Sequence, residues 1–177
     1  MKGMLAINIS RCTACKTCEL ECAMAHSAAG TLEAILAAGE KAQRRIVVEP
    51  AGTLAVPLQC RHCEDAPCIA VCPTKAMHRN GAGFPVLVDD RTCIGCRACI
   101  AVCPFGAIAM GRAGPAVVKC DLCIRRLAKG QEPACAAGCP TKAITFTTAE
   151  QAAAETRHAA AERFLVAVGR SSAAQQE

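Results

Sequence analysis

The stretch Cys93-Ile94-Gly95-Cys96-Arg97-Ala98-Cys99-Ile100-Ala101-Val102-Cys103-Pro104 decides the fold, because it brings four cysteines into one short run. The chain has 177 residues and 16 cysteines, and every cysteine falls into one of four groups of four. Group one is Cys12, Cys15, Cys18 and Cys22, and group two is Cys60, Cys63, Cys68 and Cys72. Group three is Cys93, Cys96, Cys99 and Cys103, and group four is Cys120, Cys123, Cys135 and Cys139. Such grouping is not expected of unrelated buried thiols.

The composition argues against an ordinary apolar core. Although 53% of the residues are hydrophobic by class, Leu, Ile, Val and Phe make up only about a fifth of the chain, close to the range in which a core becomes too thin. Ala and Cys supply most of the remainder, and each buries little area at about 25 cal/mol per Å². We therefore expect metal centres held by cysteines to fill the interior.

Cysteine use also bears on the compartment. The N-terminus has neither the apolar segment of a secretory signal nor a twin arginine, and no apolar run reaches the roughly 18–20 residues of a membrane span. These features predict a cytoplasmic protein without direct membrane insertion, although a partner with an export signal could carry the chain across a membrane. A reducing cytoplasm favours metal sites over disulfides.

The spacing within the groups indicates iron–sulfur clusters. Groups one and three follow C-x₂-C-x₂-C-x₃-C, the run of bacterial ferredoxins, and groups two and four are that run with one lengthened gap. Three closely spaced cysteines let a tight loop wrap one cubane, while the fourth begins a helical turn and ligates the other cluster of a pair. We predict four [4Fe-4S] clusters. Zinc prefers two short cysteine pairs converging on one ion, which group four alone would fit.

A zinc-stabilised nucleic-acid-binding module is the alternative, prompted by the net charge of +5 and the C-x₂-C pairs. The chain has four Phe and no Trp or Tyr, so it lacks the aromatic platforms that bind single strands. Its basic residues form only short pairs, such as Arg44-Arg45 and Arg125-Arg126. Thiolate ligation adds roughly −2 per oxidised site and brings the holoprotein to about −3. We therefore interpret the basic residues as counter-charge for the cofactors and expect no nucleic-acid partner.

Between the cysteine groups, the periodicity of apolar residues and the positions of Gly and Pro predict short strands and helices. Strands are expected over residues 5–9, 53–58, 84–89, 116–119 and 143–147. Helices are expected over residues 19–27, 28–44 and 148–168, with Thr147-x-x-Glu150 as a capping box for the last. Pro50-Ala51-Gly52 reads as a turn, and a frayed tail is expected from residue 171.

Three stretches resemble a known family: Gln59-Cys60-Arg61-His62-Cys63-Glu64-Asp65-Ala66-Pro67-Cys68, Val71-Cys72-Pro73-Thr74-Lys75-Ala76 and Lys119-Cys120-Asp121-Leu122-Cys123. They look like the four-cluster ferredoxin-like electron-transfer subunits of dimethyl-sulfoxide reductase-type molybdenum or tungsten enzymes and formate dehydrogenases. Related subunits serve aldehyde oxidoreductases, hydrogenases and carbon monoxide dehydrogenases. The similarity covers roughly residues 4–147.

The resemblance implies an α+β chain of two interleaved bacterial ferredoxin-like folds, each holding two clusters, with an inserted segment and a C-terminal helix. The outer half would comprise residues 1–27 and 113–147, and the inner half residues 55–112. Residues 28–54 would be the insertion, and residues 148–177 the C-terminal helix and tail.

The resemblance also implies how the cysteines pair into ligand sets. Cluster 1 would be held by Cys12, Cys15, Cys18 and Cys139, and cluster 2 by Cys60, Cys63, Cys68 and Cys103. Cluster 3 would be held by Cys93, Cys96, Cys99 and Cys72, and cluster 4 by Cys120, Cys123, Cys135 and Cys22. Every ligand position is a cysteine, although Ala23 replaces the proline that follows the last cysteine in the other groups.

No nucleophile–base pair, phosphate-binding loop or carboxylate pair stands out, so we expect a non-catalytic subunit. The expected function is electron relay between a catalytic subunit and a second redox partner. A molybdenum or tungsten enzyme of the formate dehydrogenase or aldehyde oxidoreductase type is the favoured catalytic partner, and a hydrogenase or carbon monoxide dehydrogenase is the alternative. Relay between copies of this chain is a further hypothesis.

Some residues outside the cysteine set have two interpretations. His62 lies inside a C-x₂-C loop and could donate a hydrogen bond that raises a cluster's potential, or simply face solvent. The other histidines are His26, His78 and His158. Three lysines beside the loops could offset cluster charge or be solvated: Lys75, Lys119 and Lys142. Residues 28–58 and the C-terminal helix could dock a catalytic partner or cover the clusters.

Overall fold

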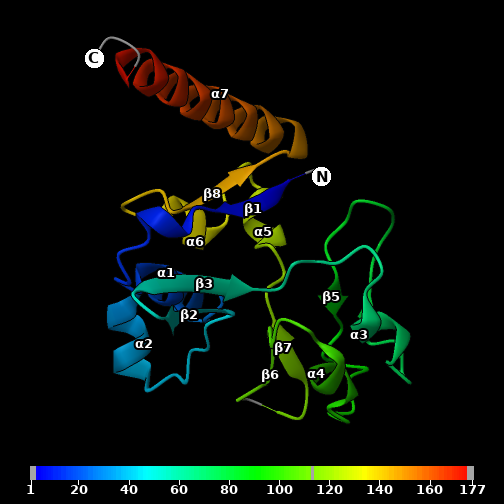
Figure 1. Cartoon of the computed structure of the whole chain (residues 1–177). Helices are drawn as coiled ribbons and strands as arrows, with labels where there is room; N and C mark the ends of the chain where they lie inside the picture. Colours follow the sequence, from blue (N-terminus) through cyan, green and yellow to red (C-terminus); the bar gives the residue numbers. More distant parts are fainter. Residues whose placement is uncertain (1–2, 113, 175–177) are drawn as a thin grey trace.

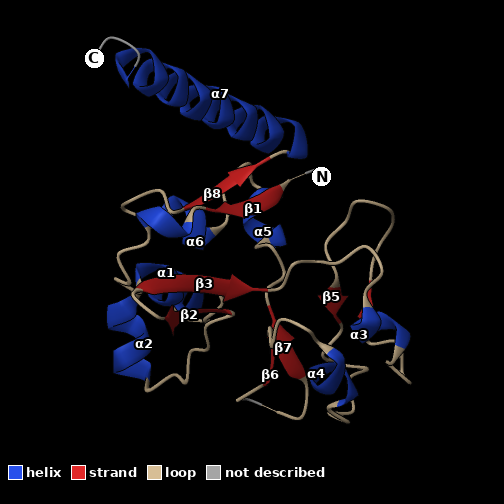
Figure 2. Ribbon diagram, viewed as in Figure 1, coloured by secondary structure: helices blue, strands red, loops and turns tan. Residues whose placement is uncertain are grey.

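The computed structural model describes residues 3–112 and 114–174, and these form an α+β fold of short elements (Figures 1 and 2). The strands are β1 (Met4–Ile7), β2 (Ile46–Ala51), β3 (Leu54–Gln59), β4 (Met77–His78), β5 (Leu87–Val88), β6 (Ile108–Met110), β7 (Val117–Lys119) and β8 (Ile144–Thr147). The helices are the 3₁₀ turn η1 (Ile9–Arg11), α1 (Thr17–Ala25), α2 (Leu32–Ala38), α3 (Pro67–Ala70), α4 (Ala98–Val102), α5 (Ile124–Leu127), α6 (Ala134–Ala137) and α7 (Ala149–Ala174).

The strands pair in antiparallel two-stranded sheets, namely β1 with β8, β2 with β3, β4 with β5, and β6 with β7. The pairing of β1 with β8 joins segments from opposite ends of the sequence, with Met4 opposite Thr147 and Ile7 opposite Ile144. A two-stranded ribbon is at best marginally stable alone. Each ribbon therefore depends on the core beneath it, and cysteines are part of that core.

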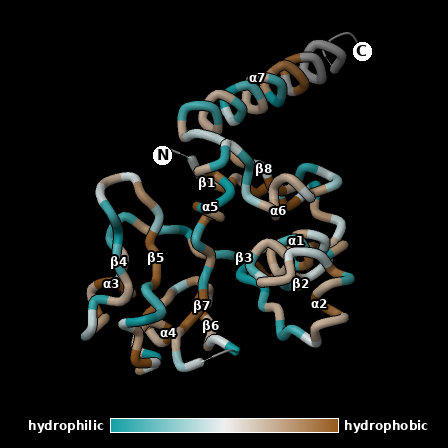
Figure 3. The backbone as a smooth tube through the Cα atoms, turned by 180° about the vertical axis from the view of Figure 1, so that it is seen from behind, coloured by the Kyte–Doolittle hydropathy of each residue, from teal (hydrophilic) through white to brown (hydrophobic). Residues whose placement is uncertain are grey.

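The buried residues form two separate cores. Core one comprises Leu5, Cys18, Cys22, Ile46, Val48, Leu122, Cys135, Ala136, Cys139, Ala143 and Ile144. Core two comprises Ala66, Cys68, Met77, Val86, Cys99, Ile108 and Val117. Core one draws on both ends of the sequence, whereas core two comes from a single continuous stretch. Their elements lie side by side in Figures 1 and 3.

The segment between groups one and two differs from expectation. The predicted helix over residues 28–44 is wrong in length, because α2 ends where Gly39 adopts a left-handed φ of 60°. The predicted turn at Pro50 and Ala51 is also wrong, since both residues belong to β2 and the hairpin turns at Gly52. Pro50 tolerates this position because a hairpin strand has a free edge. The predicted boundary between the insertion (residues 28–54) and the inner half (residues 55–112) falls inside the β2–β3 hairpin and stays a prediction.

The β2–β3 hairpin packs on α1. The Glu19 carboxylate accepts a hydrogen bond from the Val48 backbone N–H at 2.7 Å and pairs with the Arg44 guanidinium at 3.0 Å. Ile46 and Val48 are both members of core one. These contacts attach the hairpin to the helix that follows group one.

The C-terminal helix α7 lies apart from the other helices at the top of Figure 1. It begins with a capping box at Thr148 and Gln151, in which each side chain accepts a hydrogen bond from the other's backbone N–H, at 3.0 and 3.2 Å. The predicted box at Thr147 and Glu150 is therefore one residue too early. The helix continues to Ala174, beyond the predicted end at residue 168, and residues 175–177 of the predicted tail lie outside the described part.

Apolar residues near the far end of α7 are exposed to solvent. Phe164 and Leu165 each have 73% of their surface exposed, and Figure 3 shows this hydrophobic stretch in brown. The exposure shows that these side chains do not cover the clusters, and docking of a catalytic partner on this helix stays a prediction. None of the helices in the described ranges combines the length and apolar character needed to cross a membrane.

Candidate metal centre

A left-handed turn recurs in the loop of every cysteine group. The residue before the second cysteine has a positive φ in all four groups: Ala14 at 58°, His62 at 50°, Gly95 at 69° and Leu122 at 59°. A positive φ is uncommon outside glycine, and such strain persists at sites where the surroundings require it. The same conformation therefore recurs in groups of different spacing.

The turn points backbone N–H groups at cysteine sulfur atoms. The His62 N–H donates to Cys60 Sγ at 3.4 Å, and the Leu122 N–H donates to Cys120 Sγ at 3.4 Å. In group one, Cys22 Sγ accepts instead from the Arg45 N–H at 3.2 Å. Hydrogen bonds to sulfur favour the thiolate, which is the form that binds metal.

Hydrogen bonds also act on the last cysteines of groups two and four. Burial alone would raise the pKa of the Cys72 thiol, but the Met77 N–H and the Thr74 hydroxyl lower it below its usual value. The pKa of Cys139 is lowered in the same way, with Ile144 and Thr141 as the donors. Both cysteines belong to a Cys-Pro-Thr-Lys-Ala sequence, so one local motif prepares two ligands.

The deeper thiols have the opposite tendency. Burial raises the pKa of Cys18 to about 11, of Cys123 to about 11 and of Cys120 to about 12. Burial also raises the pKa of Cys135, reinforced by the neighbouring Cys120. Ionising several close, buried thiols requires a compensating positive charge, which bound iron would supply.

The charges that act on these thiols show which cysteines lie close together. Cys135 is influenced by Cys120, Cys22 and Cys123, and also by Cys18. Cys18 is influenced by Cys15 and Cys139, and Cys68 by Cys60 and Cys103. Cys99 is influenced by Cys93 and Cys96, and also by Cys68. Most of these neighbours share an expected ligand set, and Cys18 and Cys68 are in the adjacent set; the sets themselves stay a prediction.

Two buried hydrogen-bond donors beside group two have no acceptor within the described chain. His62 Nδ1 accepts from the Val86 N–H at 3.0 Å, so Nε2 carries the ring proton, yet Nε2 has no partner. Arg79 holds the carbonyl groups of His62 and Cys63 through Nη2, while its buried Nε is also unpartnered. Buried donors normally find acceptors, and cluster sulfur atoms next to this loop fit that need. These two unpartnered N–H donors therefore fit a site that holds iron–sulfur clusters.

Comparison with known proteins identifies the family. Residues 52–149 match the 4Fe-4S dicluster domain family. This protein belongs to the dicluster family. It is 36% identical to the probable anaerobic dimethyl sulfoxide reductase chain YnfG of Escherichia coli (strain K12), over 82% of this chain and 73% of the relative.

Two other relatives of this dicluster protein are another dimethyl sulfoxide reductase chain and a protein named only for its iron and sulfur. It is 39% identical to the B subunit of anaerobic dimethyl sulfoxide reductase from Escherichia coli (strain K12), over 79% of this chain and 70% of the relative. It is 43% identical to an iron-sulfur protein of Rhodospirillum rubrum, over 77% of each sequence. The dicluster protein is thus a non-catalytic electron-transfer subunit with four [4Fe-4S] clusters, and these cofactors replace the zinc alternative.

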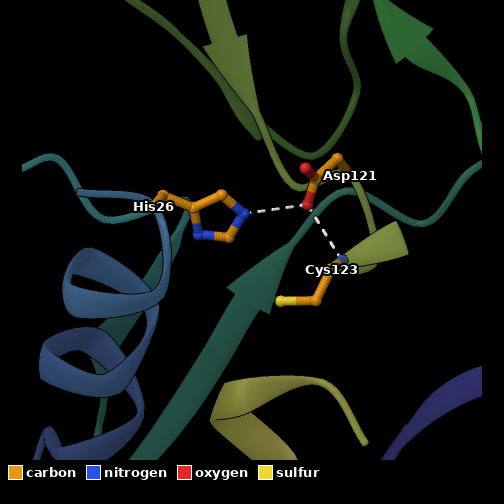
Figure 4. Close-up of side chains that lie close together, drawn as sticks. All are labelled: His26, Asp121 and Cys123. Atoms are coloured by element: carbon orange, nitrogen blue, oxygen red, sulfur yellow. Dashed lines mark hydrogen bonds and ion pairs between the residues drawn. The ribbon is translucent and has the colours of Figure 1, made fainter. Parts of the chain in front are cut away.

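His26 and Asp121 of the dicluster protein form a close group with Cys123, one of the expected ligands of cluster 4 (Figure 4). Asp121 Oδ1 accepts from His26 Nε2 at 3.0 Å and from the Cys123 N–H at 2.9 Å, and Oδ2 pairs with Arg45 at 2.9 Å. Burial alone would raise the pKa of Asp121, but His26 and Arg45 hold it well below its usual range. Because the Asp121 carboxylate is occupied in this way, we interpret the group as structural. We call it the tie: the hydrogen bonds and ion pair by which Asp121 holds His26 and Arg45 to the loop of group four.

The tie arises because α1 is longer than the other helices that follow cysteine groups. With Ala23 in place of proline, α1 continues past Cys22 to Ala25 and brings His26 to Asp121. Burial alone would lower the pKa of His26, but hydrogen bonds to Asp121 and Cys22 raise it to about 9. The missing proline was the available signal, but no local pattern predicted the partner at Asp121.

The structure also places the other histidines and the lysines that the sequence analysis singled out. Simple solvent exposure, one of the two interpretations of His62, is wrong because Nε2 is buried and Nδ1 accepts a hydrogen bond from the Val86 N–H. Among the lysines of the dicluster protein beside the loops, Lys119 is buried with 3% of its surface exposed, whereas Lys75 and Lys142 are exposed. His78 Nδ1 lies 3.0 Å from the Ala76 carbonyl oxygen. His158 is exposed on α7 beside Glu162.

Proposed function

We propose that this subunit carries electrons between the catalytic subunit of a molybdenum or tungsten oxidoreductase and a second redox partner. The observation that carries the proposal is the left-handed turn before the second cysteine, which recurs in all four cysteine loops and in two of them aims a backbone N–H at a cysteine sulfur. The relatives named as dimethyl sulfoxide reductase chains favour a catalytic partner of that general type. A formate dehydrogenase, an aldehyde oxidoreductase, a hydrogenase and a carbon monoxide dehydrogenase are the specific alternatives that the experiment below separates.

The proposal includes the ligand sets and the interleaved halves expected from the sequence. The two cores support the interleaving, because core one contains cysteines of groups one and four and core two contains cysteines of groups two and three. The pairing of β1 with β8 supports it as well. We further propose the cytoplasm as the location, since sixteen ligand thiols need a reducing compartment during assembly.

The chain's own residues have three roles in this function. They supply thiolates, they aim N–H groups at sulfur, and they exclude water from the deeper ligands, such as Cys135. When bound, each [4Fe-4S] cluster supplies a one-electron redox couple whose potential depends on hydrogen bonds, burial and charge. Cys15 and Cys96 are exposed and belong to different halves. We therefore propose that partner proteins approach the chain at these two positions.

The test is anaerobic purification of the tagged protein from its native cells, followed by metal analysis and identification of the bound proteins. We expect a brown protein that bleaches with dithionite and co-purifies with a molybdenum- or tungsten-containing subunit. That partner's substrate should change the redox state of the clusters in the complex: an electron-donating substrate such as formate should bleach them, and an electron-accepting substrate such as dimethyl sulfoxide should restore the colour of the dithionite-reduced complex. A Cys135→Ser variant should show reduced iron content. A colourless protein with stoichiometric zinc would refute the cluster assignment, and a nickel-containing partner would refute the molybdenum or tungsten assignment.

A further inference from the structure

Lys119 is a buried cation between two cysteine groups. It ends β7, directly precedes Cys120 of group four, and has 3% of its surface exposed. Its ammonium donates hydrogen bonds to the backbone carbonyls of Val86 and Cys120. It forms no ion pair with a carboxylate among the residues that the structure describes.

The contacts of Lys119 extend to group two through a single residue. Val86 is fully buried in core two, and its N–H donates to His62 Nδ1 at 3.0 Å. His62 lies between Cys60 and Cys63, so Val86 is held from one side by a group-two loop and from the other by Lys119. The chain thus fixes the ammonium between loops of two groups.

The charge of Lys119 acts on ligands in both groups. Burial raises the pKa of the Cys68 thiol and of the Cys120 thiol, and in both cases the Lys119 ammonium opposes that rise. Cys68 belongs to group two and Cys120 to group four. Backbone carbonyls solvate an ammonium without neutralising it, and an uncompensated buried charge is costly. Two anionic clusters would provide the missing compensation.

We propose that Lys119 is the shared counter-charge of the clusters bound by groups two and four, and that it raises the reduction potentials of both. The inference rests on the proposed ligand sets. A fixed positive charge stabilises the reduced cluster, which carries one more negative charge than the oxidised cluster. Because the ammonium is buried, salt screens the effect only weakly. Lys119 is therefore a positioned charge at the junction between the two cluster pairs.

The chain offers matched controls for this charge. Lys75 and Lys142 each lie three residues after the last cysteine of groups two and four, but both side chains are exposed. Removing either charge should have little effect, since exposed charges are screened by water and salt. The comparison separates burial from mere proximity in sequence.

The experiment is a potentiometric titration of the anaerobic holoprotein, followed by EPR, with iron and sulfide content measured for each sample. The variants are Lys119→Gln, Lys119→Met, Lys119→Arg, Lys75→Gln and Lys142→Gln. For the two neutral Lys119 variants, we expect the reduction equilibrium of two clusters to weaken about tenfold, which is about 59 mV for a one-electron couple. The other two clusters, and all four clusters in the Lys75 and Lys142 variants, should stay near wild type. Lys119→Arg should keep the wild-type potentials.

Each outcome decides the proposal. Unchanged potentials in the neutral variants, an equal shift of all four clusters, or an equal shift in the exposed-lysine variants would overturn it. If both neutral variants lose iron while Lys119→Arg keeps full iron content, the need for the charge is supported. Loss of iron in Lys119→Arg as well would assign Lys119 a packing role and overturn the proposal. A wild-type protein without clusters would instead refute the proposed function.

Discussion

Replacing Asp121 with asparagine tests the tie that joins α1, the loop before β2 and group four. The carboxylate accepts hydrogen bonds from His26 and the Cys123 N–H and pairs with Arg45. Asparagine keeps the shape and one carbonyl acceptor but removes the negative charge. The side chains of His26 and Arg45 are only 11% and 25% exposed, so water replaces the lost interaction poorly.

The size of the effect follows from the lost bonds. A hydrogen bond to a charged group contributes about 1.5–3 kcal/mol. Asparagine retains the bond to Cys123 but weakens the bonds to His26 and Arg45, so we expect the free energy of unfolding to fall by about 3 kcal/mol. At about 2–4 °C per kcal/mol for a chain of this size, Tm should fall by about 6–12 °C.

The assay is anaerobic thermal unfolding of the holoprotein by circular dichroism at one fixed scan rate, because iron loss can make unfolding irreversible. A double-mutant cycle with Arg45→Gln should give a coupling energy of about 1–2 kcal/mol. Asp89→Asn is the control, because the Asp89–Arg91 pair is on the surface and should matter little. A Tm for Asp121→Asn equal to that of Asp89→Asn, or strict additivity in the cycle, would refute the reasoning.

Three further predictions concern packing and iron. In chemical unfolding, Gly95→Ala should destabilise the protein by about 1–3 kcal/mol more than Gly106→Ala. Both glycines have a positive φ, but only at Gly95 would an added Cβ lie 2.5 Å from the Pro115 carbonyl oxygen. Equal effects of the two substitutions would contradict the steric argument. Ile144→Ala should lower the free energy of unfolding by about 2–5 kcal/mol, since Ile144 is 1% exposed; the exposed Leu36→Ala should change it little, and similar values for the two would count against core one. Removing iron with a chelator should increase the protease sensitivity of both cores and reduce helical circular dichroism, with α7 retaining part of the helical signal because it lies apart from the cores; native protease resistance without iron would show that the fold does not need its clusters.

The cysteine groups and the short strands between them could be predicted because both depend on local spacing. The predicted strands over residues 116–119 and 143–147 each lie within one residue of β7 and β8. The predicted helix over residues 28–44 failed at Gly39, where a left-handed φ ended it despite neighbours that favour helix. The α7 capping box was misplaced because Thr147 and Thr148 both offer a hydroxyl, and Gln151 decided between them.

The features that could not be predicted depend on contacts between distant residues. His26 and Asp121 are 95 residues apart in sequence, and neither position carries a local signal for the other. Lys119 has the same sequence context as any lysine beside a cluster loop, and only the packing of Val86 and core two determines that it is buried. Burial and long-range pairing are tertiary properties, which local patterns describe poorly.

The two cores also imply an order of assembly during synthesis. Core two comes from residues 66–117, so the ribosome delivers all of its residues before group four has been made. Core one needs Leu5 from the first strand and Ile144 from the last, so it waits for nearly the whole chain. Because folding proceeds as segments emerge, the cysteines of core two are available before those of core one are complete. We therefore expect a chain truncated before β8 to lose core one but keep core two.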